Sequence, residues 1–279
     1  MTRSDFDKAP ILVLGANGKT GRRVAQRLDA AGFSVRACAR STQPRFDWNE
    51  RSTWEAALAG VQRVYVTYQP DLAIPGALDT VSAFFDTALA NGTERIVLLS
   101  GRGEEEAQAA ENALQRSGAT WTILRCSWFM QNFSESFLLA PIREGTLALP
   151  VGDIAEPFVD AEDIADAAVA ALTQPGHENR LYELTGPRAI SFAEALACIA
   201  HESRRDLRLA PVPADAFRAG LIEAGVSKPE TDLILYLFTT VLDGRNEKPA
   251  DGVRLALHRE ARSFEDYARR TAQSGVWNA

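Results

Sequence analysis

The sequence predicts an α/β protein built on a doubly wound parallel sheet, with a smaller C-terminal α/β lobe. Within the first 125 residues, short apolar runs alternate with amphipathic stretches, which is the pattern of strands and crossover helices in a parallel sheet. A glycine-rich turn joins the first apolar run to the first amphipathic stretch. Beyond Arg125 the alternation weakens and longer helical stretches appear.

Five strands are expected in the first half, because five segments rich in leucine or β-branched residues end near turn-forming or polar residues. They span residues 11–14, 34–38, 63–66, 95–99 and 121–124. A helix is expected over residues 19–31, where Val24, Leu28 and Ala31 recur on one face and Gly32 ends the pattern. Further helices are expected over residues 129–139, 163–172, 191–201 and 229–242.

The composition argues against several classes of function. A net charge of −7, with basic residues scattered among acidic ones, argues against a nucleic acid as partner. No run approaches the roughly 18 apolar residues of a membrane span, so no membrane segment is expected. The polar segment 1–8 lacks the apolar core of a signal peptide, which predicts a cytoplasmic protein. Single histidines and three distant cysteines suggest neither a metal site nor a disulfide framework.

The glycine-rich turn has the spacing Gly15-x-x-Gly18-x-x-Gly21 and lies between an expected strand and an expected helix. Gly15 permits the tight turn, Gly18 lets the backbone approach a pyrophosphate, and Gly21 lets helix and strand pack closely. This context predicts a dinucleotide-binding domain of Rossmann type over residues 1–150. Residues 151–279 are then expected to form mainly a substrate lobe, with some segments interleaved. The alternative is a strand-to-helix turn with a purely structural role.

The end of the second expected strand distinguishes NAD from NADP, because an acidic residue there repels a 2′-phosphate. Arg40 and Ser41 occupy that place, and a guanidinium with a hydroxyl favours the phosphate, so NADP(H) is the predicted cofactor. The alternative for Arg40 is a solvated surface charge. Asp47 is predicted to lie near the adenine amino group, and a turn role competes with this interpretation. The predicted contacts from the turn itself are Gly15, Asn17, Gly18, Lys19, Thr20 and Gly21.

Ligands of parallel α/β sheets bind beyond the carboxyl ends of the strands. The residues at these ends are therefore predicted to contact the cofactor, and they are Thr67, Tyr68, Gln69, Ser100, Gly101 and Cys126. Three side chains from the same connections are candidate catalytic residues: Tyr68 as a proton donor, Arg102 as an anion-binding group and Trp128 as an aromatic wall. The alternatives are packing for Tyr68, a solvated loop charge for Arg102 and ordinary core for Trp128.

Further motifs extend along nearly the whole chain, among them Val97-Leu-Leu-Ser100, Phe129-Met-Gln-Asn132 and Phe158-Val-Asp-Ala-Glu-Asp-Ile-Ala165. Together with the glycine turn they resemble the NmrA-like group of atypical short-chain dehydrogenases/reductases. With Phe46-Asp-Trp48 and Asp243-Gly-Arg245, the chain is similar to the branch that includes the ergot-alkaloid festuclavine and agroclavine dehydrogenases. Those relatives reduce an iminium carbon with NADPH, so the resemblance implies an NADP-dependent oxidoreductase.

Segment 100–111 lacks the Tyr-x-x-x-Lys pair with which ordinary short-chain dehydrogenases protonate a carbonyl oxygen, and Ala107 stands where NmrA-like relatives often keep a lysine. Iminium reduction needs no such pair, because hydride adds to an already cationic carbon. We therefore predict an NADPH-dependent reductase of a small organic substrate, with a C=N iminium, C=C or quinone-like group, in specialised metabolism. The alternative is a non-catalytic NADP(H)-binding redox sensor. A homodimer is left open.

Overall fold

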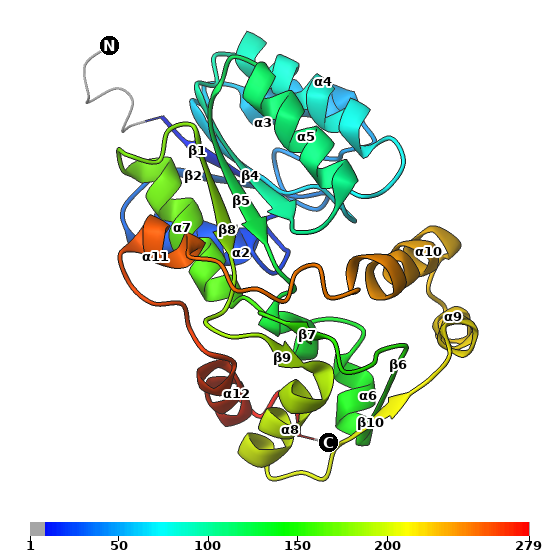
Figure 1. Cartoon of the computed structure of the whole chain (residues 1–279). Coiled ribbons are helices and arrows are strands. Elements are labelled where there is room, and N and C mark those ends of the chain that lie inside the picture. Colours follow the sequence, from blue (N-terminus) through cyan, green and yellow to red (C-terminus); the bar gives the residue numbers. More distant parts are fainter. Residues whose placement is uncertain (1–8, 279) are drawn as a thin grey trace. The chain divides into compact units, whose positions relative to one another are not determined.

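The computed structural model describes residues 9–278, and its largest element is a six-stranded parallel sheet (Figure 1). The strands lie in the order β2-β1-β3-β4-β5-β8. Their bounds are β1 Ile11–Leu14, β2 Val35–Cys38, β3 Arg63–Val66, β4 Arg95–Gly101, β5 Thr120–Cys126 and β8 Arg180–Leu184. Because β2 lies on one side of β1 and the later strands on the other, the strand order reverses between β1 and β3. This reversal is the topological switch point of the sheet.

Helices cover both faces of this sheet (Figure 1). One layer consists of α3 (Trp54–Leu58), which follows the short 3₁₀ turn η1 (Arg51–Thr53), α4 (Ala77–Ala90) and α5 (Glu105–Arg116). The other layer consists of α2 (Gly21–Ala30), α7 (Ala161–Thr173) and α11 (Gly252–Leu257). All four residues of β1 and of β3 are buried, as strands covered on both faces require. The sheet predicted from alternating segments is confirmed.

The chain folds as two compact units, each assembled from separate segments. Residues 9–126, 161–184 and 251–259 form the first unit, which contains the six-stranded sheet and its helices. Residues 127–160, 185–250 and 260–278 form the second unit. This division differs from the predicted boundary at residue 150, because the chain leaves the sheet directly after β5 and returns later to add α7, β8 and α11.

The second unit is built from short helices and two small sheets around an aromatic core. In one sheet β6 (Thr146–Leu149) pairs in parallel with β10 (Arg208–Pro211), and in the other β7 (Ala155–Glu156) pairs antiparallel with β9 (Ile190–Ser191). Its helical elements are η2 Met130–Phe133, α6 Leu139–Glu144, α8 Phe192–Ser203, α9 Ala214–Glu223, α10 Lys228–Tyr236, η3 Leu237–Val241 and α12 Phe264–Gln273.

Most expected helices are present, and one prediction is wrong. The continuous helix expected over residues 129–139 is replaced by the 3₁₀ turn η2 and, after an irregular stretch, by α6. Ser136 explains the interruption, because its hydroxyl donates to the carbonyl oxygen of Asn132 at 2.6 Å and accepts from the N–H of Leu138 at 3.2 Å. The helix expected over residues 191–201 is α8, which starts with a capping box formed by Ser191 and Glu194.

Among residues 9–278 no helix is long and apolar enough to cross a membrane. Within the same range, no three His, Cys, Asp or Glu side chains are grouped as metal ligands. The segment 1–8, on which the prediction of a cytoplasmic location rests, lies outside the described residues.

Candidate functional site

The glycine turn after β1 requires glycine at two positions, because a side chain at either would clash with neighbouring atoms. Gly15 has a φ of +62°, and a Cβ there would lie 2.5 Å from Cγ2 of Thr67. A Cβ on Gly21 would lie 2.2 Å from the carbonyl oxygen of Gly15, so α2 approaches β1 closely only because residue 21 lacks a side chain. The N–H of Gly18 donates to that same oxygen at 2.8 Å and closes the turn.

The N-terminus of α2 adjoins this turn and has no acidic residue in its first turn. Thr20 takes the N-cap position without a side-chain capping bond, and the first turn of the helix contains no acidic residue. The positive end of the helix dipole therefore has no carboxylate within that turn, which favours a negatively charged ligand. Asn17 ties the turn to the connection after β2, because its Nδ2 donates to Oγ of Ser41 at 3.1 Å.

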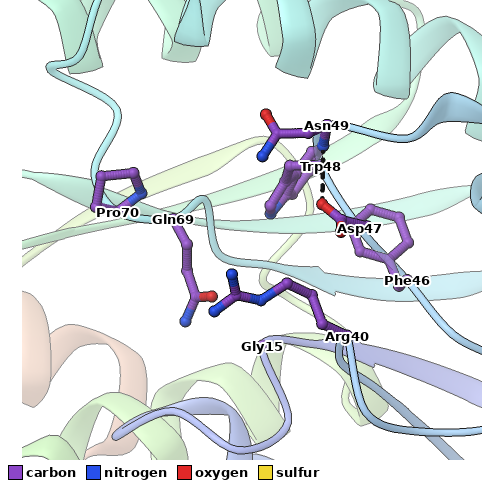
Figure 2. A pocket seen from close by; sticks show the side chains of 8 residues that line it. All are labelled: Gly15, Arg40, Phe46, Asp47, Trp48, Asn49, Gln69 and Pro70. Carbon is purple, nitrogen blue, oxygen red and sulfur yellow. Dashed lines mark hydrogen bonds between the residues drawn. The ribbon is translucent and has the colours of Figure 1, made fainter. Parts of the chain in front are cut away.

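A pocket of about 380 Å³ opens beside the glycine turn (Figure 2). Its lining combines the ends of β1 and β3 with the connection that follows β2, through Gly15, Arg40, Phe46, Asp47, Trp48, Asn49, Gln69 and Pro70. Leu14 of β1 lies opposite Cys38 of β2 in the sheet, so the two strands end at the same edge and the connections that follow them begin there. The pocket therefore lies at the topological switch point, where ligands of parallel α/β sheets bind.

Aromatic packing holds the connection after β2 in place as a wall of this pocket. Phe46 and Trp48 are buried, with ring centroids 4.9 Å apart, and both pack edge-on against Phe84 of α4. The indole N–H of Trp48 donates to the carbonyl oxygen of Thr67 at 3.2 Å. This hydrogen bond attaches the aromatic wall, formed by Phe46 and Trp48, to the carboxyl end of β3.

The two charged side chains of the pocket differ in their partners. Arg40 extends its guanidinium toward Gln69 (Figure 2), and it has no ion-pair partner among residues 9–278. Asp47 accepts a hydrogen bond from the N–H of Asn49 at 3.0 Å and forms an ion pair with Arg45 at 2.8 Å. Asp47 therefore shapes its own turn and lines the pocket, so its two proposed roles do not exclude each other.

A buried acid and a chain of ion pairs lie at the carboxyl ends of β4, β5 and β8. Glu111 of α5 is 2% exposed and accepts from Oγ of Ser100 at 2.6 Å. Arg125 of β5 donates to both carboxylate oxygens of Glu111, at 2.9 and 2.5 Å, and to Glu183 of β8 at 3.0 Å. This bidentate geometry satisfies the buried charge and joins α5 to two strands.

Arg102 continues the same chain of ion pairs, with Nε 3.3 Å from a carboxylate oxygen of Glu183. Its side chain is 12% exposed, so the alternative of a solvated loop charge is wrong. Cys126, at the end of β5, is buried, and burial raises the pKa of its thiol well above the usual value. Such a thiol stays protonated and unreactive at neutral pH. Catalysis by Arg102 and cofactor contact by Cys126 stay predictions.

The two aromatic candidates lie in different units. Tyr68 follows β3 in the first unit and is half-buried, with its ring 5.0 Å from that of Trp48. Trp128 belongs to the second unit, where it packs against Phe192 and Phe238 at 5.7 and 4.8 Å between ring centroids. Both side chains keep a partly exposed surface, and their proposed roles at a substrate stay predictions.

The pocket brings together part of the predicted cofactor site, namely Gly15, Arg40, Asp47 and Gln69. Four lining residues were not predicted as cofactor contacts: Phe46, Trp48, Asn49 and Pro70. An available signal was their position beside Asp47 and Gln69 in the sequence. Ser100, Gly101 and Cys126 lie at the ends of β4 and β5, outside the pocket lining.

The chain is similar to known proteins in sequence and in fold. Residues 15–175 match the model of the NAD(P)H-binding family. The chain is 32% identical over 287 residues to a (4-alkanoyl-5-oxo-2,5-dihydrofuran-3-yl)methyl phosphate reductase of Streptomyces griseus, covering 95% of this chain and 98% of that relative. It is 29% identical over 285 residues to agroclavine dehydrogenase of Claviceps fusiformis, covering 96% and 98%. A solved structure of Citrobacter triphenylmethane reductase complexed with NADP(H) superposes with a TM-score of 0.78 at 21% identity, covering 94% and 99%.

The match to the family model covers more than half of the chain and begins at Gly15, the first glycine of the turn. The relative from Streptomyces extends the similarity over both units. The resemblance inferred from the motifs is confirmed by the similarity to agroclavine dehydrogenase. The chain therefore belongs to the NAD(P)H-binding family, within the NmrA-like atypical short-chain dehydrogenases/reductases, and is an oxidoreductase.

Proposed function

We propose that this chain is an NADPH-dependent reductase of a small organic substrate whose reacting group is a C=N iminium, a C=C bond or a quinone. The observation that carries the proposal is the guanidinium of Arg40, which lies in the pocket beside Gly15 without an ion-pair partner among the described residues. A cation at this place fits the 2′-phosphate that NADPH carries and NADH lacks.

The other binding groups follow the same arrangement. The glycine turn and the N-terminus of α2 suit the pyrophosphate, and Asp47 with the aromatic wall suits the adenosine. Thr67, Ser100, Gly101 and Cys126, at the carboxyl edge of the same sheet, are proposed to line the nicotinamide half. When bound, NADPH supplies a hydride, and the protein contributes orientation and the exclusion of water.

The substrate classes follow from the proton donors that the site offers. Ala107 of α5 is fully buried and supplies no ammonium group at the position where the resemblance to NmrA-like proteins implies a lysine. Reduction of an iminium needs no proton on the acceptor atom, whereas reduction of an enone or a quinone consumes one. The phenol of Tyr68, which is partly exposed beside the pocket residue Gln69, is the proposed donor for these substrates.

Turnover of NADPH tests the function directly. Pure protein is mixed with NADPH and a panel of iminium, enone and quinone compounds, and loss of NADPH absorbance is recorded. We expect oxidation with at least one class. The variant Tyr68→Phe keeps the ring against Trp48 and removes only the hydroxyl, so it should slow enone or quinone reduction and leave iminium reduction unchanged. No oxidation with any class contradicts the proposal.

A non-catalytic redox sensor is the second candidate, favoured by the buried Ala107 and the missing Tyr-x-x-x-Lys pair. A sensor must bind oxidised and reduced cofactor with different affinities, because a ligand without such a difference shifts no equilibrium. Calorimetric titration with NADP⁺ and with NADPH distinguishes the two functions. Equal affinities, together with turnover of a substrate, support the reductase and contradict the sensor.

A further inference from the structure

Two carboxyl groups meet at the carboxyl edge of the six-stranded sheet. Asp71 lies in the connection from β3 to α4, and Glu104 lies between β4 and α5. Their side chains are hydrogen-bonded to each other, and Glu104 is only 8% exposed. Glu104 takes the N-cap position of α5 but forms no capping bond. Its carboxyl group lies over Gly101 instead, where a Cβ would be 2.2 Å from Oε1.

A hydrogen bond between two carboxyl groups requires a proton on one of them. Asp71 is the better anion, because its carboxylate accepts from the backbone N–H of Ala73 at 2.9 Å. Burial, followed by the negative charge of Asp71, raises the pKa of Glu104 to about 9. The other charges that act on Glu104 are also acidic, namely Glu106 and Glu111, which both lie on α5. Glu104 therefore carries the shared proton at neutral pH.

One member of the Asp71–Glu104 pair directly follows, in the chain, two residues that line the pocket beside the glycine turn. Gln69 and Pro70, which line the pocket, come directly before Asp71 in the chain. On the other side of the pair, the Glu104 carboxyl contacts the end of β4 at Gly101. The hydrogen bond therefore fastens the connection after β3 to the neighbouring strand end. Two ionised carboxylates in place of this hydrogen-bonded pair would repel each other, and the connection after β3 would lose this attachment.

We propose that Asp71 and Glu104 form a proton-dependent clasp that positions the connection after β3 for dinucleotide binding, and that loss of the shared proton at alkaline pH weakens the binding of NADPH. The inference rests on the proposed function, which places NADPH in the pocket lined by Gln69 and Pro70. Asp71 and Glu104 act here as positioning residues, because neither lines the pocket.

The size of the effect follows from the fraction of molecules that keep the proton. If only the protonated clasp binds, the apparent Kd equals the intrinsic Kd divided by that fraction. With a Glu104 pKa of about 9, affinity is constant below about pH 8 and falls about tenfold by pH 10. NADPH affinity therefore falls, and does not rise, with increasing pH, because the raised pKa means that the proton is lost only at alkaline pH.

The test is the dissociation constant of NADPH, measured by calorimetry in small steps from neutral to alkaline pH. Wild-type protein should lose affinity at high pH as described. Glu104→Gln places an amide that donates to Asp71 at every pH, so its affinity should resemble that of wild type at neutral pH and stay level. Glu105→Gln is the matched control, because Glu105 is its exposed neighbour in the chain and the charge change is the same. This control should keep the wild-type profile.

A second variant keeps the test valid if Glu104→Gln does not fold. Asp71→Asn removes the negative partner and lets an amide donate to Glu104, so it should also flatten the alkaline loss of affinity. Alkaline loss in these variants as steep as in wild type overturns the clasp alone, provided that NADPH binds at pH 7. Absence of NADPH binding to wild-type protein at pH 7 overturns the proposed function and the clasp with it.

Discussion

Replacement of Gly21 by alanine tests the packing of the glycine turn most sharply. The added Cβ would lie 2.2 Å from the carbonyl oxygen of Gly15, 2.7 Å from its carbonyl carbon and 3.0 Å from the carbonyl oxygen of Leu14. Ordinary carbon–oxygen contacts lie at about 3.3 Å, so the first distance is short by about 1 Å. All three atoms belong to the backbone, so a change of rotamer does not relieve the clash.

The helix α2 must therefore move away from β1, and packing on the far side of the helix changes as well. Over-packed sites of this kind cost about 1 to 3 kcal/mol, and a clash with fixed backbone belongs at about 3 kcal/mol. Chemical denaturation followed by circular dichroism gives the change in unfolding midpoint.

The matched control is Gly220→Ala. Gly220 lies within α9, and the added Cβ would have no atom within 4 Å apart from its own chain neighbours and the backbone of its own helix. This replacement should raise the free energy of unfolding by up to about 1 kcal/mol, because alanine favours the helix. If Gly21→Ala unfolds at the same denaturant concentration as wild type, the close approach of α2 to β1 is wrong.

Three further predictions address the pocket, the buried acid and the pH dependence. Gly18→Ala should keep the fold, since its Cβ would lie 3.1 Å from one backbone oxygen at an ordinary φ. The added methyl group would lie at the pyrophosphate, so NADPH binding in a fluorescence titration should weaken at least about tenfold, and unchanged affinity would refute that placement. Glu111→Ala leaves Arg125 without its bidentate partner and should lower the free energy of unfolding by about 3 to 5 kcal/mol in denaturant unfolding. Glu105→Ala, at an exposed site on the same helix, should lower it by less than about 0.5 kcal/mol, and equal losses would contradict the buried ion pair. The pKa of Glu104 is raised in the folded protein from 4.5 to about 9, so the unfolded chain releases this proton at a lower pH than the folded protein. The free energy of unfolding should therefore fall as the pH rises from 4.5 to about 9, with a shallower slope in Glu104→Gln. Identical slopes would show that Glu104 is ionised at neutral pH.

The sequence predicts the local features of this protein well. The first strand, residues 11–14, and the turn at Gly15 follow from residues that are neighbours in the chain, namely an apolar run and the glycine spacing. In the same way, the helix expected over residues 191–201 is present as α8, and it begins with a capping box between two residues that are close in sequence, Ser191 and Glu194. These features depend on backbone preferences and short-range hydrogen bonds, which the local sequence determines.

Features that join distant segments could not be predicted from the sequence. The ion pair between Arg102 and Glu183 forms only because β8 is added beside β5 after the chain has built part of the second unit. The contact between Asp71 and Glu104 likewise requires that β3 and β4 be neighbours with aligned carboxyl ends. Local patterns contain no information on which distant charges meet, so Arg102 had a solvated loop charge as its alternative interpretation.

We propose that Arg40 selects NADPH in the pocket at the switch point of the sheet. The most direct measurement is calorimetric titration of wild-type protein and of Arg40→Gln with NADPH and with NADH. Loss of a charge-assisted contact to a phosphate of about 1.5 to 3 kcal/mol predicts that NADPH binds Arg40→Gln about 10- to 150-fold more weakly. NADH should bind both proteins equally and more weakly than NADPH binds wild type. Equal affinity of wild type for the two cofactors, or an unchanged NADPH affinity in Arg40→Gln, contradicts selection of NADPH by Arg40.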